Sequence, residues 1–222
     1  MATIPPNYIV GIVASAGALN AYRALLKSLP PNTGMAFVLV SHISPAVNSL
    51  LAQVLSRHTK MPVLLASTAT PIRANHVYVL PANADLRIEN YAFKAVSPRS
   101  TRDVQIDLFF SSLAEAMGAR AIGIVLSGYD GDGSEGCKSI KAKGGTTFAQ
   151  DQSADVEDMS RSAQVSGYVD FVLPPEKIAK ALSRIGARFV RDEHLGNNRN
   201  GRDSLVTKSK RPSQKKPTTQ SV

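Results

Sequence analysis

The hydrophobic positions along the first 190 residues follow two alternating patterns. Short runs that are apolar throughout alternate with segments in which apolar residues recur every three or four positions. The first pattern is typical of strands buried on both faces, and the second of helices with one buried face. The apolar runs predict strands over residues 8–13, 35–40, 63–65, 121–126, 146–149 and 169–172. The amphipathic segments predict helices over residues 18–29, 46–56, 134–143, 160–166 and 175–185, and one that Asp103 caps and that runs to about Met117.

A different pattern lies between residues 76 and 95. Three short runs, 76–80, 86–89 and 92–95, are separated by turn residues, which indicates short, partly antiparallel strands. Elsewhere strands and helices alternate. The chain is therefore predicted to form a doubly wound, mostly parallel α/β sheet with helices on both faces and a short antiparallel extension (about residues 76–95).

The composition is that of an ordinary globular protein. The chain has 222 residues, of which 43% are hydrophobic and 19% charged, which excludes a disordered chain and an integral membrane protein. A single cysteine, Cys137, excludes an internal disulfide and a metal site built from several cysteines. We expect neither a metal nor a cofactor.

The net charge of +9 is concentrated at the C-terminal end. Residues 191–222 hold eight Lys and Arg against three Asp and Glu, a net charge of +5, which leaves +4 for the rest. This end also lacks a hydrophobic period, which predicts a basic disordered tail over residues 191–222. The remaining residues, 1–190, are predicted to form one folded domain. No aromatic residues are interleaved with the basic ones, so we expect no nucleic-acid partner.

The apolar run over residues 8–19 is not a convincing targeting segment. The small residues around Ser15 resemble a signal-peptidase site, but no Lys or Arg precedes the run, and Pro5 and Pro6 interrupt its start. The run is also too short to span a bilayer as a helix. We therefore expect a cytoplasmic protein that is not inserted in a membrane.

Three predicted strands end in residues that could perform hydrolysis. Ser15 follows the first strand, His42 follows the second, and Asp130 and Asp132 follow the strand over residues 121–126. The carboxyl ends of parallel strands carry the working residues in sheets of this kind. A serine nucleophile, an imidazole that takes its proton and a carboxylate that orients the imidazole together form a hydrolase site.

Each of these residues also has a purely structural interpretation. Ser15 stands before a helix, where a capping serine is common, and Val13 occupies the first glycine position of a nucleophile elbow. From this stretch alone, the capping role is favoured. His42 is the one histidine at a carboxyl strand end, but buried strand ends also hold structural histidines. The loop with Asp130 and Asp132 fits a turn and helix cap better than a phosphate or calcium loop, and either aspartate could orient the imidazole.

Taken together, these segments resemble the catalytic domain of the CheB-type chemotaxis receptor methylesterases. The resemblance runs from about Tyr8 to Ile185, and its motifs are specific when they occur in this order and spacing. They are the stretches 11–17 (GIVASAG), 40–45 (VSHISP), 98–109 (PRSTRDVQIDLF), 123–133 (GIVLSGYDGDG), 144–151 (GGTTFAQD) and 169–174 (VDFVLP).

The resemblance implies a Ser–His–Asp hydrolase on a doubly wound sheet. It implies Ser15 as the nucleophile, His42 as the general base and Asp132, rather than Asp130, as the triad acid. The backbone N–H of Tyr129 matches an oxyanion-hole donor, with that of Ala16 as the second. Arg99 matches a basic residue near the cleft that would contact the acidic receptor surface.

The sequence departs from the family's pattern at several positions beside these residues. Val13 and Ala18 stand where the family usually has Gly, and Ala16 stands where it has Thr. Tyr129 and Asp130 replace a usual Met and Gly. The family's N-terminal receiver domain is also not expected, because the first catalytic strand begins at residue 8.

The expected function is the removal of methyl esters from glutamate side chains of chemoreceptors, with release of methanol, in bacterial chemotaxis. Deamidation of selected glutamines is a second expected activity. The expected partners are the cytoplasmic helices of a methyl-accepting receptor and a separate response regulator. Two alternatives remain open: a non-catalytic or partner-regulated signalling module of the same fold, and an esterase of small molecules.

Overall fold

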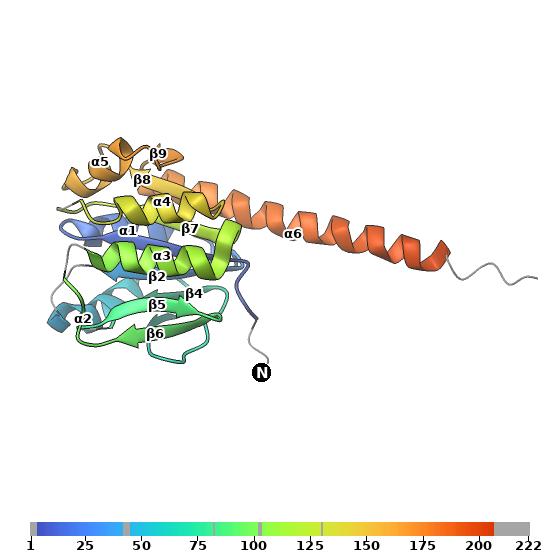
Figure 1. Cartoon of the computed structure of the whole chain (residues 1–222), viewed down its shortest axis with the longest axis horizontal. Helices are drawn as coiled ribbons and strands as arrows, with labels where there is room; N and C mark the ends of the chain where they lie inside the picture. The colour runs from blue at the N-terminus through green and yellow to red at the C-terminus, as the bar shows by residue number, and fades with distance from the viewer. Residues whose placement is uncertain (1–3, 42–44, 82, 102–103, 130, 207–222) are drawn as a thin grey trace, which may run out of the picture. The chain divides into compact units, whose positions relative to one another are not determined.

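A parallel sheet forms the centre of the protein (Figure 1). The computed structural model describes residues 4–41, 45–81, 83–101, 104–129 and 131–206. Within these residues seven strands join in the order β3-β4-β2-β1-β7-β8-β9, and all neighbours are parallel. The strands are β1 (Tyr8–Ala14), β2 (Met35–Ser41), β3 (Val63–Leu65), β4 (His76–Val79), β7 (Ala121–Val125), β8 (Thr146–Gln150) and β9 (Phe171–Leu173). The strand order reverses between β1 and β7, which is where sheets of this kind form a crevice at their carboxyl ends.

Helices cover both faces of the sheet, as the sequence predicts. The buried side chains of α1 (Ala18–Ser28), of α2 (Pro45–Leu55) and of the first turns of α6 (Pro175–Val206) pack in one hydrophobic cluster. Those of α3 (Gln105–Met117), α4 (Ser134–Ala142) and α5 (Asp158–Val165) pack in the cluster on the other face. A short 3-10 helix, Gly118–Arg120, connects α3 to β7. The doubly wound α/β architecture is thus confirmed.

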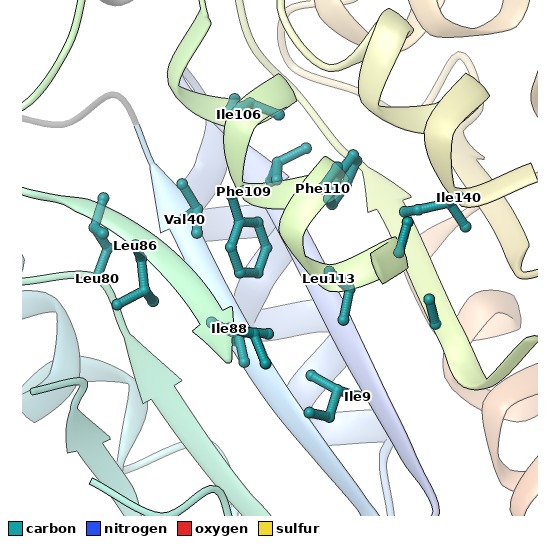
Figure 2. Packing of buried hydrophobic residues seen from close by; sticks show 14 of the residues in the cluster. Ile9, Val40, Leu80, Leu86, Ile88, Ile106, Phe109, Phe110, Leu113 and Ile140 are labelled. Carbon is teal, nitrogen blue, oxygen red and sulfur yellow. The ribbon is translucent and has the colours of Figure 1, made fainter. Parts of the chain in front are cut away.

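Helix α3 is fixed by a closely packed apolar face (Figure 2). Phe109 and Leu113 of this helix are fully buried, in one cluster with Ile9 of β1 and with Leu86 and Ile88 of the strand β5 (Asp85–Glu89). Burying a side chain of this size contributes roughly 1.5–3 kcal/mol to folding. This packing determines where the N-terminus of α3 lies at the carboxyl edge of the sheet.

The antiparallel part of the fold is smaller than expected. Among the strands of the described residues, only β5 (Asp85–Glu89) and β6 (Ala92–Val96) pair in antiparallel fashion, as a separate two-stranded sheet, and one isolated antiparallel bridge joins Pro71 to Ala92. The sequence predicts that the run beginning at His76 belongs to this antiparallel part, but it forms β4 and pairs in parallel with β2 and β3. The burial explains the difference, because β4 is buried on both faces, like the other central strands, whereas β5 exposes Arg87 and Glu89 on one face.

The last helix is longer than the predicted segment over residues 175–185. Helix α6 continues to Val206, so residues 191–206, expected as disordered, are helical. No proline occurs between Pro175 and Pro212, and an ion pair between Arg188 and Asp192, four residues apart, supports the helix. Residues 207–222 lie outside the described part. By its contacts the chain divides into Met1–Gly186 and Ala187–Val222, so the predicted boundary near residue 190 stays a prediction.

No helix among the described residues is both long and apolar enough to cross a lipid bilayer. No group of three or more His, Cys, Asp and Glu side chains among them is arranged to hold a metal ion.

Candidate active site

Ser15 lies in a tight turn between the end of β1 and the start of α1. Gly17, which takes the N-cap position of α1, has a φ of +74°, a left-handed conformation that favours glycine. A Cβ atom at Gly17 would also lie 2.7 Å from the Cβ of Asp155. No side chain caps this helix, so the capping role that the local sequence favours for Ser15 is not what the structure shows. The half-buried serine is therefore held at the strand end without serving the helix as its cap.

The glycine-rich loop after β7 lies directly against Ser15. The N–H of Ser15 donates to the carbonyl oxygen of Ser127 over 2.9 Å. A Cβ atom at Gly128 would come within 2.9 Å of the Cβ of Ser15 and 2.7 Å of the sulfur of Met159. Only glycine permits this approach. The next residue, Tyr129, has 57% of its surface exposed. It directly follows the glycine that contacts Ser15.

Asp132 is a buried carboxylate at the N-terminus of α3. Its surface is 5% exposed, and its two carboxylate oxygens accept hydrogen bonds from the N–H of Ile106 (2.9 Å) and of Asp107 (3.1 Å). The free N–H groups and the positive end of the helix dipole favour a negative charge there. The predicted helix-cap role of this loop is thus present, but the helix capped is α3 and not the one that follows the loop. Asp130, the other candidate acid, lies outside the described residues.

Asp107, which lies in the first turn of α3, in turn binds the start of α4. One oxygen of its carboxylate accepts hydrogen bonds from the N–H of Gly133 (3.0 Å) and of Gly136 (2.7 Å). Burial raises the pKa of Asp107 above its usual value, and the nearby charge of Asp132 adds to the rise, while these hydrogen bonds oppose it. The two aspartates therefore join the loop with Asp132 to the first turns of α3 and α4.

The second predicted triad position follows the strand that adjoins β1. β2 ends at Ser41, which is paired with Ala14 of β1. His42 and the two residues after it lie outside the described residues. The hydroxyl groups of Ser41 and Tyr22 are 2.6 Å apart, and Tyr22 is fully buried in α1. Burial raises the pKa of Tyr22, so the tyrosine stays protonated and this strand end is held by a neutral hydrogen bond.

Arg99, the predicted substrate contact, lies in the loop between β6 and α3. The loop is anchored by the buried carboxylate of Asp85, which accepts from the N–H of Ser100 (2.9 Å) and from the side-chain amide of Gln105 (3.2 Å). Gln105 is the first residue of α3, so the loop that bears the half-buried Arg99 is tied to the helix that holds Asp132.

Sequence reasoning missed three residues that shape this site. Asp107, Asp85 and Ser127 are ordinary helix, strand and loop residues by local pattern, and their partners are 15 to 111 residues away. Such partners follow from tertiary packing. For Asp107, an acidic residue in the first turn of a helix was a weak signal, and Ser127 stands within the glycine-rich motif.

The arrangement can support hydrolysis by a serine. The described part of the site brings the turn with Ser15 into contact with the glycine-rich loop, and the same loop ends in the buried carboxylate of Asp132. Backbone N–H groups at a helix start and in a tight loop are the kind of donors that stabilise an oxyanion.

Comparisons with known proteins show what the whole chain is similar to. A family model described as CheB methylesterase matches residues 10–182. A putative protein-glutamate methylesterase/protein-glutamine glutaminase of Leptospira interrogans is 32% identical over 181 residues, which cover 80% of this chain and 93% of that protein. Protein-glutamate methylesterase/protein-glutamine glutaminase 2 of Anaeromyxobacter dehalogenans is 34% identical over 180 residues, and the match covers 53% of its length.

A solved structure shows the same fold. The crystal structure of the Thermotoga maritima CheB methylesterase catalytic domain matches with a TM-score of 0.75 and 27% sequence identity, over 80% of this chain and 98% of that domain. The stretch that the family model matches includes Ser15 and Asp132. The chain belongs to the CheB methylesterase family.

Proposed function

We propose that this protein hydrolyses methyl esters of glutamate side chains on chemoreceptors, with Ser15, His42 and Asp132 as its catalytic triad. One observation carries the proposal: in a chain of this family, the turn with Ser15 leaves the capping position to Gly17 and lies against the glycine-rich loop. The relatives' names include both glutamate methylesterase and glutamine glutaminase activity.

The reaction divides into two acyl-transfer steps. The Ser15 Oγ attacks the ester carbonyl carbon while His42 takes the hydroxyl proton, and the C–O bond to the methoxy group then breaks. His42 returns the proton to the leaving group, and methanol departs. Water, deprotonated by His42, next attacks the carbonyl carbon of the acyl-enzyme, and the bond from that carbon to the Ser15 Oγ breaks. His42 returns the proton to the Ser15 Oγ, and the product leaves as the glutamate carboxylate after its acid proton passes to water. Asp132 would orient the imidazole and stabilise its charged form.

Two backbone N–H groups, of Ala16 and Tyr129, would stabilise the oxyanion of each tetrahedral intermediate. Support comes from their places in the chain: Ala16 follows the nucleophile, and Tyr129 follows the glycine that contacts Ser15. Donors that are already fixed cost no reorganisation during the reaction, which is why this kind of stabilisation is strong.

The same acyl-enzyme accounts for the second activity. With a glutamine side chain, Ser15 would form the same ester to the enzyme, and ammonia would leave in place of methanol after accepting the proton from His42. Hydrolysis would again produce glutamate. We therefore propose glutamine deamidation as a side activity of one site.

The proposed partners follow from this substrate. The receptor would be bound by its cytoplasmic helices, with Arg99 contacting their acidic surface, and the protein would act in the cytoplasm. Support for Arg99 is its place in a loop tied through Asp85 to the start of α3. We also propose a separate response regulator as a partner that controls activity.

The test is release of methanol from receptor membranes carrying labelled methyl esters. Ser15→Ala is expected to abolish release while the circular dichroism spectrum stays that of the wild type. Ser56→Ala is a matched control, because Ser56 is a surface serine at the C-terminal end of α2 whose hydroxyl donates to the carbonyl of Gln53. Full release by Ser15→Ala would contradict the proposal.

A second measurement separates the alternatives. A fluorophosphonate probe is expected to label the wild type at Ser15 and to leave Ser15→Ala unlabelled. Absence of labelling in the wild type would favour the non-catalytic module. Turnover of simple esters without methanol release from receptors would favour the small-molecule esterase.

A further inference from the structure

Ser127 is a fully buried residue with hydrogen bonds in several directions. Its hydroxyl donates to the carbonyl oxygen of Ala16 (2.7 Å) and accepts from the N–H of Val156 (3.0 Å). Its backbone N–H donates to the side-chain oxygen of Gln150 (3.0 Å), and its carbonyl accepts from Ser15. One residue thus connects the turn after β1, the loop after β7 and the segment after β8.

The contacts with the turn lie on both sides of the proposed nucleophile. The Ser127 carbonyl holds the N–H of Ser15, which belongs to the peptide group before it. The Ser127 hydroxyl holds the carbonyl of Ala16, which belongs to the peptide group after that residue. The peptide group between these two carries the N–H of Ala16. Fixing the two outer peptide groups therefore fixes the direction of the Ala16 N–H and of the Ser15 side chain.

We infer that Ser127 is a positioning residue for ester hydrolysis: its hydroxyl sets the orientation of the Ser15–Ala16 segment, and through it that of the nucleophile and an oxyanion donor. The inference rests on the proposed function of Ser15. The local environment supports it, because the Ser127 Oγ lies so close to Gly17 that a Cβ atom there would collide with it. The hydroxyl is in contact with the turn itself.

The hydroxyl of Ser127 acts here as a donor and as an acceptor at once. Val156 offers only its N–H to the site and Ala16 only its carbonyl, so a group between them must accept from one and donate to the other. With Ser127 at 0% exposure, bulk water does not reach the gap. An alanine would leave both backbone groups without this partner.

Ser127→Ala tests the inference, with methanol release from methylated receptor membranes as the assay. We expect kcat to fall by about 10-fold to 100-fold, since a displacement on the order of 1 Å at a catalytic group has effects of this size. KM should change by less than about twofold, because the proposed receptor contact, Arg99, lies in a different loop from Ser127. Labelling of Ser15 by the fluorophosphonate probe should slow in parallel with kcat.

Ser160→Ala is the matched control. Ser160 is equally buried, with 1% exposure, and its hydroxyl donates to the carbonyl of Glu157 inside the first turn of α5. The same atom is removed, so a similar fall in Tm is expected, with kcat and the labelling rate unchanged. A fall in kcat that is equal in Ser127→Ala and Ser160→Ala would show a general effect of lost packing and would overturn the inference.

A second variant keeps the test decisive if Ser127→Ala does not fold. Ser127→Cys fills the same place with a thiol, a weaker donor and acceptor, and is expected to lower kcat by at least about threefold. A folded Ser127→Ala, or failing that Ser127→Cys, with kcat within the error of the wild type would overturn the inference. A wild type that neither releases methanol nor reacts with the probe would instead contradict the proposed function.

Discussion

Asp107 and Asp132 each accept hydrogen bonds from the backbone of the segment that carries the other. Asp132 accepts from the N–H of Asp107 itself, and Asp107 accepts from the N–H of Gly133, the residue after Asp132. The exchange couples the first turns of α3 and α4. A carboxylate has about four acceptor positions, so the two bonds to α3 do not use the whole capacity of Asp132. The proposed role of Asp132 as the triad acid would add the imidazole of His42 to these partners.

The raised pKa of Asp107 predicts how stability depends on pH. The folded state holds this proton more tightly than the unfolded chain, so Asp107 favours folding most at low pH. That contribution is lost as the pH rises from about 4 through the raised pKa of the folded state. Asp107→Asn lacks the titration. We expect the Tm of the wild type minus that of Asp107→Asn to decrease as the pH rises, in thermal melts across this range.

Asp107→Ala provides the control for the hydrogen bonds. It removes both acceptor bonds to α4, and we expect it to lower the free energy of unfolding by about 1–3 kcal/mol, whereas Asp107→Asn keeps an acceptor oxygen and should lose less. A Tm difference between the wild type and Asp107→Asn that is constant with pH would contradict the role assigned to burial.

The contact between Gly128 and Ser15 predicts a loss of activity from one added methyl group. Gly128→Ala would place a Cβ atom 2.9 Å from the Cβ of Ser15, so the turn or the loop must move. We expect kcat for methanol release to fall by about 10-fold to 100-fold. Gly131→Ala is the matched control in the same loop, because its Cβ atom would meet nothing closer than the Ser162 Oγ at 3.7 Å. Equal kcat in the two variants would show that this approach is not needed.

The hydrogen bond between Tyr22 and Ser41 predicts coupled effects on stability. Tyr22→Phe and Ser41→Ala should each lower the free energy of unfolding by about 1 kcal/mol. The double variant should lose less than the sum, by at least about 0.5 kcal/mol, because both single variants break the same bond. Urea denaturation measures all four proteins.

Tyr78→Phe is the control for this cycle. Tyr78 is also a buried tyrosine, but its hydroxyl accepts from the N–H of Arg73 and donates to the carbonyl of Pro71. Its effect should add to that of Ser41→Ala. Additivity of Tyr22→Phe with Ser41→Ala would mean that the bond contributes little to holding the end of β2.

The sequence by itself determined the order and type of the elements and the strand ends at which to look for chemistry. Periodicity is local, so runs such as 35–40 and 121–126 could be recognised as buried strands without knowledge of their neighbours. The family motifs pointed to Ser15, His42 and Asp132 for the same reason, because each motif is a short stretch with fixed spacing. The sequence pattern did not indicate the full length of the last helix, because the second half of this helix has no apolar stripe.

Only the tertiary structure decided what surrounds those residues. It showed that Gly17, not Ser15, takes the cap position of α1, and that β4 joins the parallel sheet. It also showed that Asp132 caps α3, a helix that begins 27 residues earlier in the sequence. These outcomes depend on hydrogen bonds and contacts between segments far apart in the chain. Local propensity carries no information about such contacts, because packing of the two hydrophobic clusters sets which strand ends and helix ends meet.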